Sequence, residues 1–119
     1  MTDEERRAKA TKIIDGIAKT AATTTAVFSQ VPGMGAATLT KLYLEMVNKI
    51  ASLFNQQLES QAARALVLTG CKRYAGAILE KSVLGWIPLV GNAINAKMTF
   101  DLTKNVGWFF YEHFDKSSE

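Results

Sequence analysis

The residues suited to acid–base or metal chemistry are few. The sequence holds one histidine, His113, inside an aromatic-rich stretch from Trp108 to Phe114. A metal site needs several converging N, S or O ligands, and no second histidine is present. As a general base His113 needs an oriented partner, but the nearby Glu112 and Asp115 face other directions if the stretch is helical. We interpret His113 as a solvated or capping residue near a helix end.

Cys71 is the one cysteine, so an internal disulfide is excluded and nothing indicates a secreted disulfide scaffold. Its neighbours Lys72 and Arg73 are of the type that lowers a thiol pKa. The alternative, a small buried residue inside a helix, is the interpretation we favour.

The run from Gly33 to Lys41 has the glycine content of a phosphate-binding loop. It lacks the Gly-x-x-x-x-Gly-Lys-Ser/Thr spacing, and no buried strand precedes it. Nucleotide binding is therefore not expected there, and the sequence predicts no cofactor, no metal site and no catalytic residue.

Basic residues are in slight excess, with 14 lysines and arginines against 11 acidic residues and a formal net charge of +3. The pI near 9.1 supports nucleic-acid or anionic-membrane binding only weakly. Four basic residues are scattered around one predicted helix without interleaved aromatics: Arg64, Lys72, Arg73 and Lys81. A solvated face is favoured over nucleic-acid binding.

One apolar stretch stands out as a candidate interaction site. It surrounds a Pro-x-x-Gly corner and contains Trp86, Ile87, Pro88 and Leu89. Turns between helices favour polar residues, so this composition needs an explanation. Either the corner is buried against other helices, or it is an exposed tip that docks on a partner or a membrane interface, where tryptophan sits well.

The 119 residues suit one domain spanning residues 1–119, with 48% hydrophobic residues. The first twelve residues lack the apolar core of a signal peptide. The most apolar stretch, residues 82–95, is shorter than the roughly 20 residues that span a bilayer. We expect a cytoplasmic protein, with peripheral membrane association as the alternative.

The chain contains an internal repeat with an offset of 56 residues. Residues 27–54 align without gaps to residues 83–110, and Pro32 falls on Pro88 and Phe54 on Phe110. Six of the aligned positions are identical, against roughly two expected from composition. The sequence therefore predicts two diverged copies, over about residues 2–56 and 57–114.

Each copy reads as a helix, a Pro-x-x-Gly corner and a second helix, because proline stops the incoming helix and can begin the next. The first helices are expected over about residues 2–29 and 57–84. Apolar residues at helical spacing in the second helices predict the core: Leu42, Met46, Ile50, Met98, Leu102 and Val106. In the third helix the apolar and small residues at helical spacing are Ala62, Ala65, Leu66, Thr69, Ala77, Ile78 and Leu84. No strand is expected, so the fold class is all-α: four helices as two αα-hairpins, bundle-like.

The stretch Gly85–Ala96, followed by Thr103–Gly107, resembles an uncharacterised bacterial helical domain. That domain is often appended to Era-like GTPases and occurs in some inner-membrane proteins. The resemblance covers about residues 13–114 and implies an accessory helical module without catalytic residues. It also implies a GTPase on another chain as a candidate partner.

Together these features predict a non-enzymatic helical module that binds a protein partner or itself through apolar helix surfaces. A homodimer is plausible, because the aromatic residues near the C-terminus cannot all point into one small core. The alternative is a membrane-peripheral protein that uses the Trp86–Pro88 corner. A small-molecule substrate is not expected. The candidate interaction residues are Trp86, Ile87, Leu89, Trp108, Phe110 and Tyr111.

Overall fold

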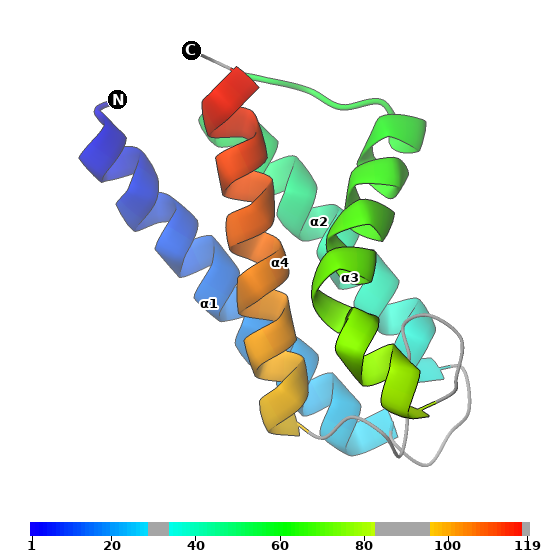
Figure 1. Ribbon diagram of the computed structural model, residues 1–119. Helices are drawn as coiled ribbons and strands as arrows, with labels where there is room; N and C mark the ends of the chain where they lie inside the picture. Colours follow the sequence, from blue (N-terminus) through cyan, green and yellow to red (C-terminus); the bar gives the residue numbers. More distant parts are fainter. Residues whose placement is uncertain (29–33, 83–95, 118–119) are drawn as a thin grey trace.

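Helices dominate the protein. The computed structural model describes the backbone of residues 1–28, 34–82 and 96–117, and the side chains of residues 1–24, 38–74 and 96–117. The helices are α1 (Asp3–Phe28), α2 (Met34–Leu53), α3 (Ser60–Ser82) and α4 (Ala96–Ser117). The described ranges contain no strand, so the predicted all-α, bundle-like fold is confirmed (Figure 1).

Local hydrogen bonds and backbone geometry mark the start of α1 and the end of α2. Thr2 caps α1, because its Oγ1 accepts from the backbone N–H of Glu5 at 3.1 Å. After the end of α2, Asn55 has a φ of 59°, the left-handed conformation that commonly ends a helix. The N–H of Gln56 then donates to the carbonyl of Ala51 at 3.0 Å and closes the last turn of α2.

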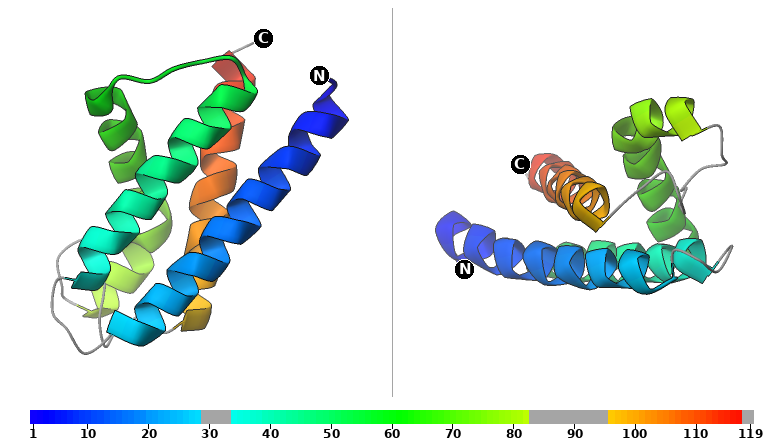
Figure 2. Two further views of the ribbon diagram at one scale, coloured as in Figure 1. Left: turned by 180° about the vertical axis from the view of Figure 1, so that it is seen from behind. Right: turned by 90° about the horizontal axis from the view of Figure 1, so that it is seen from below.

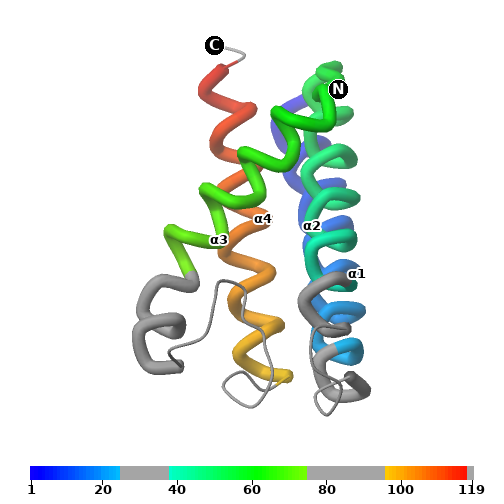
Figure 3. Tube along the Cα trace, turned by 90° about the vertical axis from the view of Figure 1, so that its right-hand side faces the viewer, coloured from blue at the N-terminus to red at the C-terminus, as the bar shows by residue number. Residues whose placement is uncertain are grey.

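The helices form two layers. Successive helices run in opposite directions, so the start of α1 and the end of α4 lie at the same end of the bundle (Figure 1). Helices α1 and α2 make one layer and α3 and α4 the other (Figures 2 and 3). Helix α1 packs most extensively against α4 and α2, whereas α3 contacts α2 and α4. The 26 residues of α1 span about 39 Å, close to the 42 Å length of the molecule.

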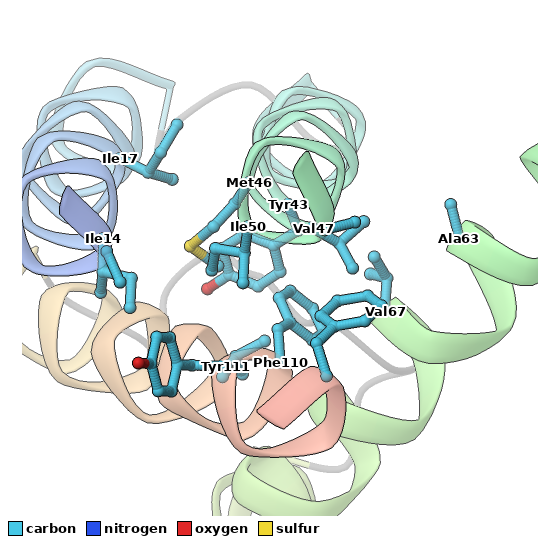
Figure 4. Close-up of a cluster of buried hydrophobic side chains, with 14 of the residues drawn as sticks. Ile14, Ile17, Tyr43, Met46, Val47, Ile50, Ala63, Val67, Phe110 and Tyr111 are labelled. Carbon is cyan, nitrogen blue, oxygen red and sulfur yellow. The ribbon is translucent and has the colours of Figure 1, made fainter. Parts of the chain in front are cut away.

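The core lies between the layers, where α1, α2 and α4 meet (Figure 4). Four of the six predicted core residues are buried: Met46, Ile50, Leu102 and Val106. Leu42 and Met98 are instead half-buried. Both lie at the margin of their helix's apolar stripe, so the prediction was wrong about full burial at these two positions.

The buried positions of α2 and α4 correspond to each other when the sequence is aligned at the repeat offset. Five buried positions of α2, and Phe54 directly after it, match six buried positions of α4 at an offset of 56 residues: 43, 46, 47, 50, 51 and 54 against 99, 102, 103, 106, 107 and 110. The types differ at several pairs, as where Tyr43 matches Thr99. Each helix therefore turns an equivalent face to the core with a different set of side chains.

The predicted stripe of α3 is wrong over the part whose side chains the structure describes. There Ala62, Ala65 and Thr69 are exposed and Leu66 is half-buried, and the buried positions are Ala63, Val67, Gly70 and Cys71. Ala77, Ile78 and Leu84 lie outside the described side chains. Small and apolar residues occur on both sides of α3, so hydrophobic spacing alone does not select one side. The side that packs is the one where Gly70 lets α4 approach closely: an added Cβ there would lie 3.1 Å from Phe109 Cδ2.

Candidate functional site

The six candidate interaction residues fall into three groups. Trp86, Ile87 and Leu89 lie outside the described residues, as do Pro32 of the first corner and the second corner from Pro88 to Gly91. Phe110 and Tyr111 are buried, with 0% and 2% of their surface exposed. Trp108 is half-buried and reaches the surface of α4. Within the described residues, Trp108 is thus the candidate that offers surface to a partner.

Trp108 belongs to a cluster on the edge between α1 and α4, here named the α1–α4 edge cluster (Arg7, Trp108 and Tyr111). The Arg7 guanidinium carbon lies 5.6 Å from the Trp108 ring centroid and 5.3 Å from that of Tyr111. The two rings meet edge to face with centroids 5.3 Å apart. Cation–π contacts at such distances contribute about 0.5–1 kcal/mol at exposed sites. The indole therefore has a stabilising contact on each of two sides.

The neighbouring Arg6 fastens the first turn of α1 to the end of α2. Its Nε donates to the backbone carbonyl oxygen of Leu53 at 3.2 Å, which satisfies a carbonyl at the helix C-terminus. Its Nη1 lies 2.8 Å from Asp3 Oδ1, and its guanidinium carbon lies 4.7 Å from the Phe54 ring centroid. The Phe54 ring in turn meets Tyr111 edge to face at 5.2 Å. The two arginines thus join three helices at one end of the bundle.

A close approach of α1 and α4 positions the α1–α4 edge cluster. Gly107 directly precedes Trp108 and lies against Ile14, where an added Cβ would be 2.8 Å from Ile14 Cγ1. Arg7 is two turns before Ile14 on the same side of α1. Because only glycine permits this separation of the two helices, Gly107 sets the distance across which Arg7 reaches the indole.

A second arginine–aromatic group, the α3–α4 edge cluster (Arg73, Tyr74 and Phe109), lies on the other side of α4. The Arg73 guanidinium carbon is 5.6 Å from the Tyr74 ring centroid and 5.8 Å from that of Phe109. The two rings meet edge to face at 6.2 Å. Both edges of α4 therefore carry a half-buried aromatic beside an exposed arginine, which makes the second cluster a natural control for the first.

The titratable side chains in the core are held neutral. Burial raises the pKa of the Cys71 thiol to about 12, so the interpretation of Cys71 as a small buried residue is confirmed. Burial also raises the pKa of Tyr43, whose hydroxyl lies 2.7 Å from Thr103 Oγ1. Burial raises the pKa of Tyr111 as well, and the nearby Arg7 opposes that shift. At neutral pH Cys71 and Tyr43 therefore stay protonated and contribute no charge to the core.

The chemistry considered for His113 finds no support in its surroundings. His113 is exposed on α4, as expected, and its backbone carbonyl accepts from Ser117 Oγ at 2.9 Å. Among the described side chains, no three His, Cys, Asp or Glu residues gather in a way that could hold a metal ion. In the same part of the chain, no helix combines the length and apolar character needed to cross a bilayer.

Sequence reasoning missed the aromatic contacts of Arg6 and Arg7. Both stand in a mixed-charge run that is typical of a solvated helix start. Their aromatic partners are Phe54, directly after α2, and Trp108 and Tyr111 on α4, and no local spacing connects residues so far apart in the chain. The one sequence signal was the crowding of aromatics after Gly107, which required some of them to meet the opening helix, a second copy or a partner.

The chain was compared with protein-family models, with curated proteins and with solved structures, and none of them matches it.

Proposed function

We propose that this chain is a non-enzymatic helical interaction module, which binds a protein partner or a second copy of itself. The observation that carries the proposal is the state of Trp108, which is half-buried at the surface and fixed between Arg7 and Tyr111. Tryptophan, tyrosine and arginine are the residue types that most often dominate binding energy at protein interfaces.

The fixed indole favours binding for a thermodynamic reason. Ordering a free side chain opposes association by about 0.5–1.5 kcal/mol, and a side chain already held in place avoids much of that loss. Trp108 is held by the Arg7 guanidinium and by the edge of the Tyr111 ring. A partner that covers the exposed part of the indole would gain apolar burial without having to immobilise it.

The burial of Cys71 and Tyr43 supports the proposal that the module is not an enzyme. A cysteine nucleophile needs a lowered pKa and access to substrate, whereas burial raises the pKa of Cys71 to about 12. Tyr43 is fully buried with its hydroxyl bonded to Thr103. These groups serve packing and hydrogen bonding inside the bundle.

The partner class follows from the family resemblance of residues 85–107. That resemblance makes a GTPase supplied by another chain the first candidate partner, with a homodimer as the second. Either partner is expected to cover the α1–α4 edge cluster, because among the predicted interaction residues that the structure describes, Trp108 is the one that reaches the surface.

The test compares two matched alanine substitutions, each in an arginine–aromatic edge cluster of α4. Trp108→Ala removes the indole of the α1–α4 edge cluster, and Tyr74→Ala removes a half-buried ring of the α3–α4 edge cluster. We expect Trp108→Ala to weaken self-association, or capture of the GTPase or other partner from the host, by roughly 30-fold. Tyr74→Ala should change it by less than about threefold. Circular dichroism would establish that both variants are folded. Equal binding by the wild type and a folded Trp108→Ala variant would refute the proposal.

A membrane-peripheral role is the second candidate, with the Trp86–Pro88 corner as its contact. The apolar sequence of that corner and an excess of lysines on one face of the bundle favour it. Replacing Trp86 with Gln and Leu89 with Gly gives the corner the residues of the first corner, Gln30 and Gly33. If the corner binds a membrane, vesicle binding should fall while the melting temperature changes little. A large drop in melting temperature without a specific binding loss would make the corner part of the core.

A further inference from the structure

We propose that the outer face of the α1–α2 layer is a docking surface for anionic lipid headgroups. The face is named the lysine face and consists of Lys9, Lys12, Lys19, Lys41 and Lys49, all exposed. This surface gives the membrane-peripheral candidate a contact that does not depend on the Trp86–Pro88 corner.

The inward direction of each helix of this layer is fixed by a contact with α4. Ile14 of α1 lies against Gly107, and Tyr43 of α2 reaches Thr103 at 2.7 Å. A side chain far around the helix from Ile14 or Tyr43 therefore points away from α4. The view from behind shows the side of α1 and α2 that faces away from the other layer (Figure 2).

The lysines occupy that outward side. At about 100° per residue, Lys12 is about 160° around α1 from Ile14, and Lys9 and Lys19 are each about 140° from it. On α2, Lys41 is about 160° and Lys49 about 120° from Tyr43. From Lys9 to Lys19 the rise along α1 is about 15 Å, and the axes of packed helices are about 10 Å apart. The five lysines thus lie on the same outward side of the two-helix layer.

This face carries more positive than negative charge. Its acidic residues are Glu5, in the first turn of α1, and Glu45, which lies 3.0 Å from Lys49. Five lysines against two carboxylates leave an excess of three, equal to the formal net charge of +3 for the chain. On α4, Lys97 pairs with Asp101 at 3.1 Å, and Lys104 of α4 lies 3.6 Å from Asp15 of α1.

The side chains between the lysines favour a lipid surface over nucleic acid. They are short and neutral, as at Gly16, Thr20 and Asn48, and do not hold the ammonium groups back from a flat surface. Tyr43 of α2 and Phe54, directly after α2, are buried, so no described ring on this face can stack on a base. Lysine is a strongly hydrated point charge that suits the diffuse potential of an anionic membrane.

The size of the effect follows from the excess charge. Each lysine near an anionic membrane contributes roughly a fivefold gain in partitioning, so three in excess give roughly 100-fold. The gain should fall steeply with added salt, because the Debye length shortens from about 10 Å at 0.1 M to about 3 Å at 1 M.

The experiment measures binding of the full chain to vesicles of phosphatidylcholine alone and with about 30% phosphatidylserine. The test variant carries Lys9→Glu, Lys12→Glu and Lys19→Glu. The control carries Arg64→Glu, Lys72→Glu and Lys116→Glu, which change the net charge equally at exposed positions of α3 and α4. We expect preference for the anionic vesicles of roughly 100-fold, loss of that preference in the test variant, and retention of most of it in the control.

Three outcomes would overturn the proposal. They are no preference for anionic vesicles, equal losses in the test and control variants, and binding of duplex DNA through the same lysines without vesicle binding. A Lys→Gln version of the test variant should also lose the preference, and it serves if the Glu version does not fold. Trp108→Ala should keep full vesicle binding, so a failure of the lysine face is distinguishable from a failure of the Trp108 proposal.

Discussion

Replacing Gly107 with alanine should destabilise the protein, whereas the same replacement at Gly16 should stabilise it. Both glycines are inside helices, where alanine is favoured by about 0.5–1 kcal/mol. At Gly16 an added methyl group meets nothing within 4 Å. At Gly107 it would lie 2.8 Å from Ile14 Cγ1, 2.9 Å from Cγ2 and 3.1 Å from Cδ1.

Ile14 cannot move aside at low cost. It is fully buried, and as a β-branched residue in a helix it has one strongly favoured χ1 rotamer. Both branches meet the new methyl group, so rotation about χ1 exchanges one clash for another. Overpacking of this kind costs about 1–3 kcal/mol. After the gain in helix propensity, we expect Gly107→Ala to lower the free energy of unfolding by about 1–2 kcal/mol.

Urea denaturation of the two variants and the wild type measures this difference. In the background of Ile14→Ala, which makes room for the methyl group, Gly107→Ala should cost about 1 kcal/mol less than in the wild type. If Gly107→Ala stabilises the protein as much as Gly16→Ala does, α1 and α4 do not approach closely at this point. The argument for how Trp108 is positioned would then fail.

Three further predictions concern the core. Tyr43→Phe removes one partner of the buried Tyr43–Thr103 hydrogen bond and should lower the free energy of unfolding by about 1–3 kcal/mol. Adding Thr103→Val should recover part of that loss, because it removes the other polar partner. A loss below about 0.5 kcal/mol in Tyr43→Phe would contradict the hydrogen bond. Leu102→Ala should lower the free energy of unfolding by about 2–5 kcal/mol and Leu42→Ala by clearly less, because Leu102 is 3% exposed and Leu42 is half-buried. A larger loss for Leu42→Ala than for Leu102→Ala in urea denaturation would contradict this core. The raised pKa of Cys71 means that its stabilising effect is complete below the unfolded pKa of 9.0 and is lost as pH rises towards about 12. The free energy of unfolding should therefore fall above pH 9, and it should fall less in the Cys71→Ala variant. Rapid reaction of the native thiol with a disulfide reagent at pH 8 would contradict the burial of Cys71.

The all-α class and most core residues of α2 and α4 were predictable from the sequence, because the apolar residues of these two helices recur at regular helical spacing. Ile50 and Val106 are buried as the spacing indicates. The side of α3 that packs was not predictable, because Ala62 and Ala63 are equally small and the deciding residue, Gly70, has no side chain to register in a hydrophobic pattern. Its role comes from Phe109 on another helix.

The candidate site was predictable only as a concentration of aromatic residues. Periodicity did not separate Trp108 from its neighbours Phe110 and Tyr111, although the first is half-buried and the others form core. That division depends on where α1 crosses α4, which is set by the contact of Gly107 with Ile14. The 56-residue repeat stays a prediction, and the matching burial of α2 and α4 supports it.

The most direct test of the interaction proposal is the accessibility of the Trp108 indole before and after assembly. The chain has two tryptophans, so a Trp86→Phe variant leaves Trp108 as the sole reporter. Acrylamide quenching of its fluorescence should show an accessible indole in the isolated chain. With the partner bound, or at concentrations where the chain self-associates, we expect quenching to fall by at least about twofold and the emission to shift to shorter wavelength, as an apolar contact covers the ring. Unchanged quenching in the assembled state would show that the partner binds elsewhere and would contradict the proposed role of Trp108.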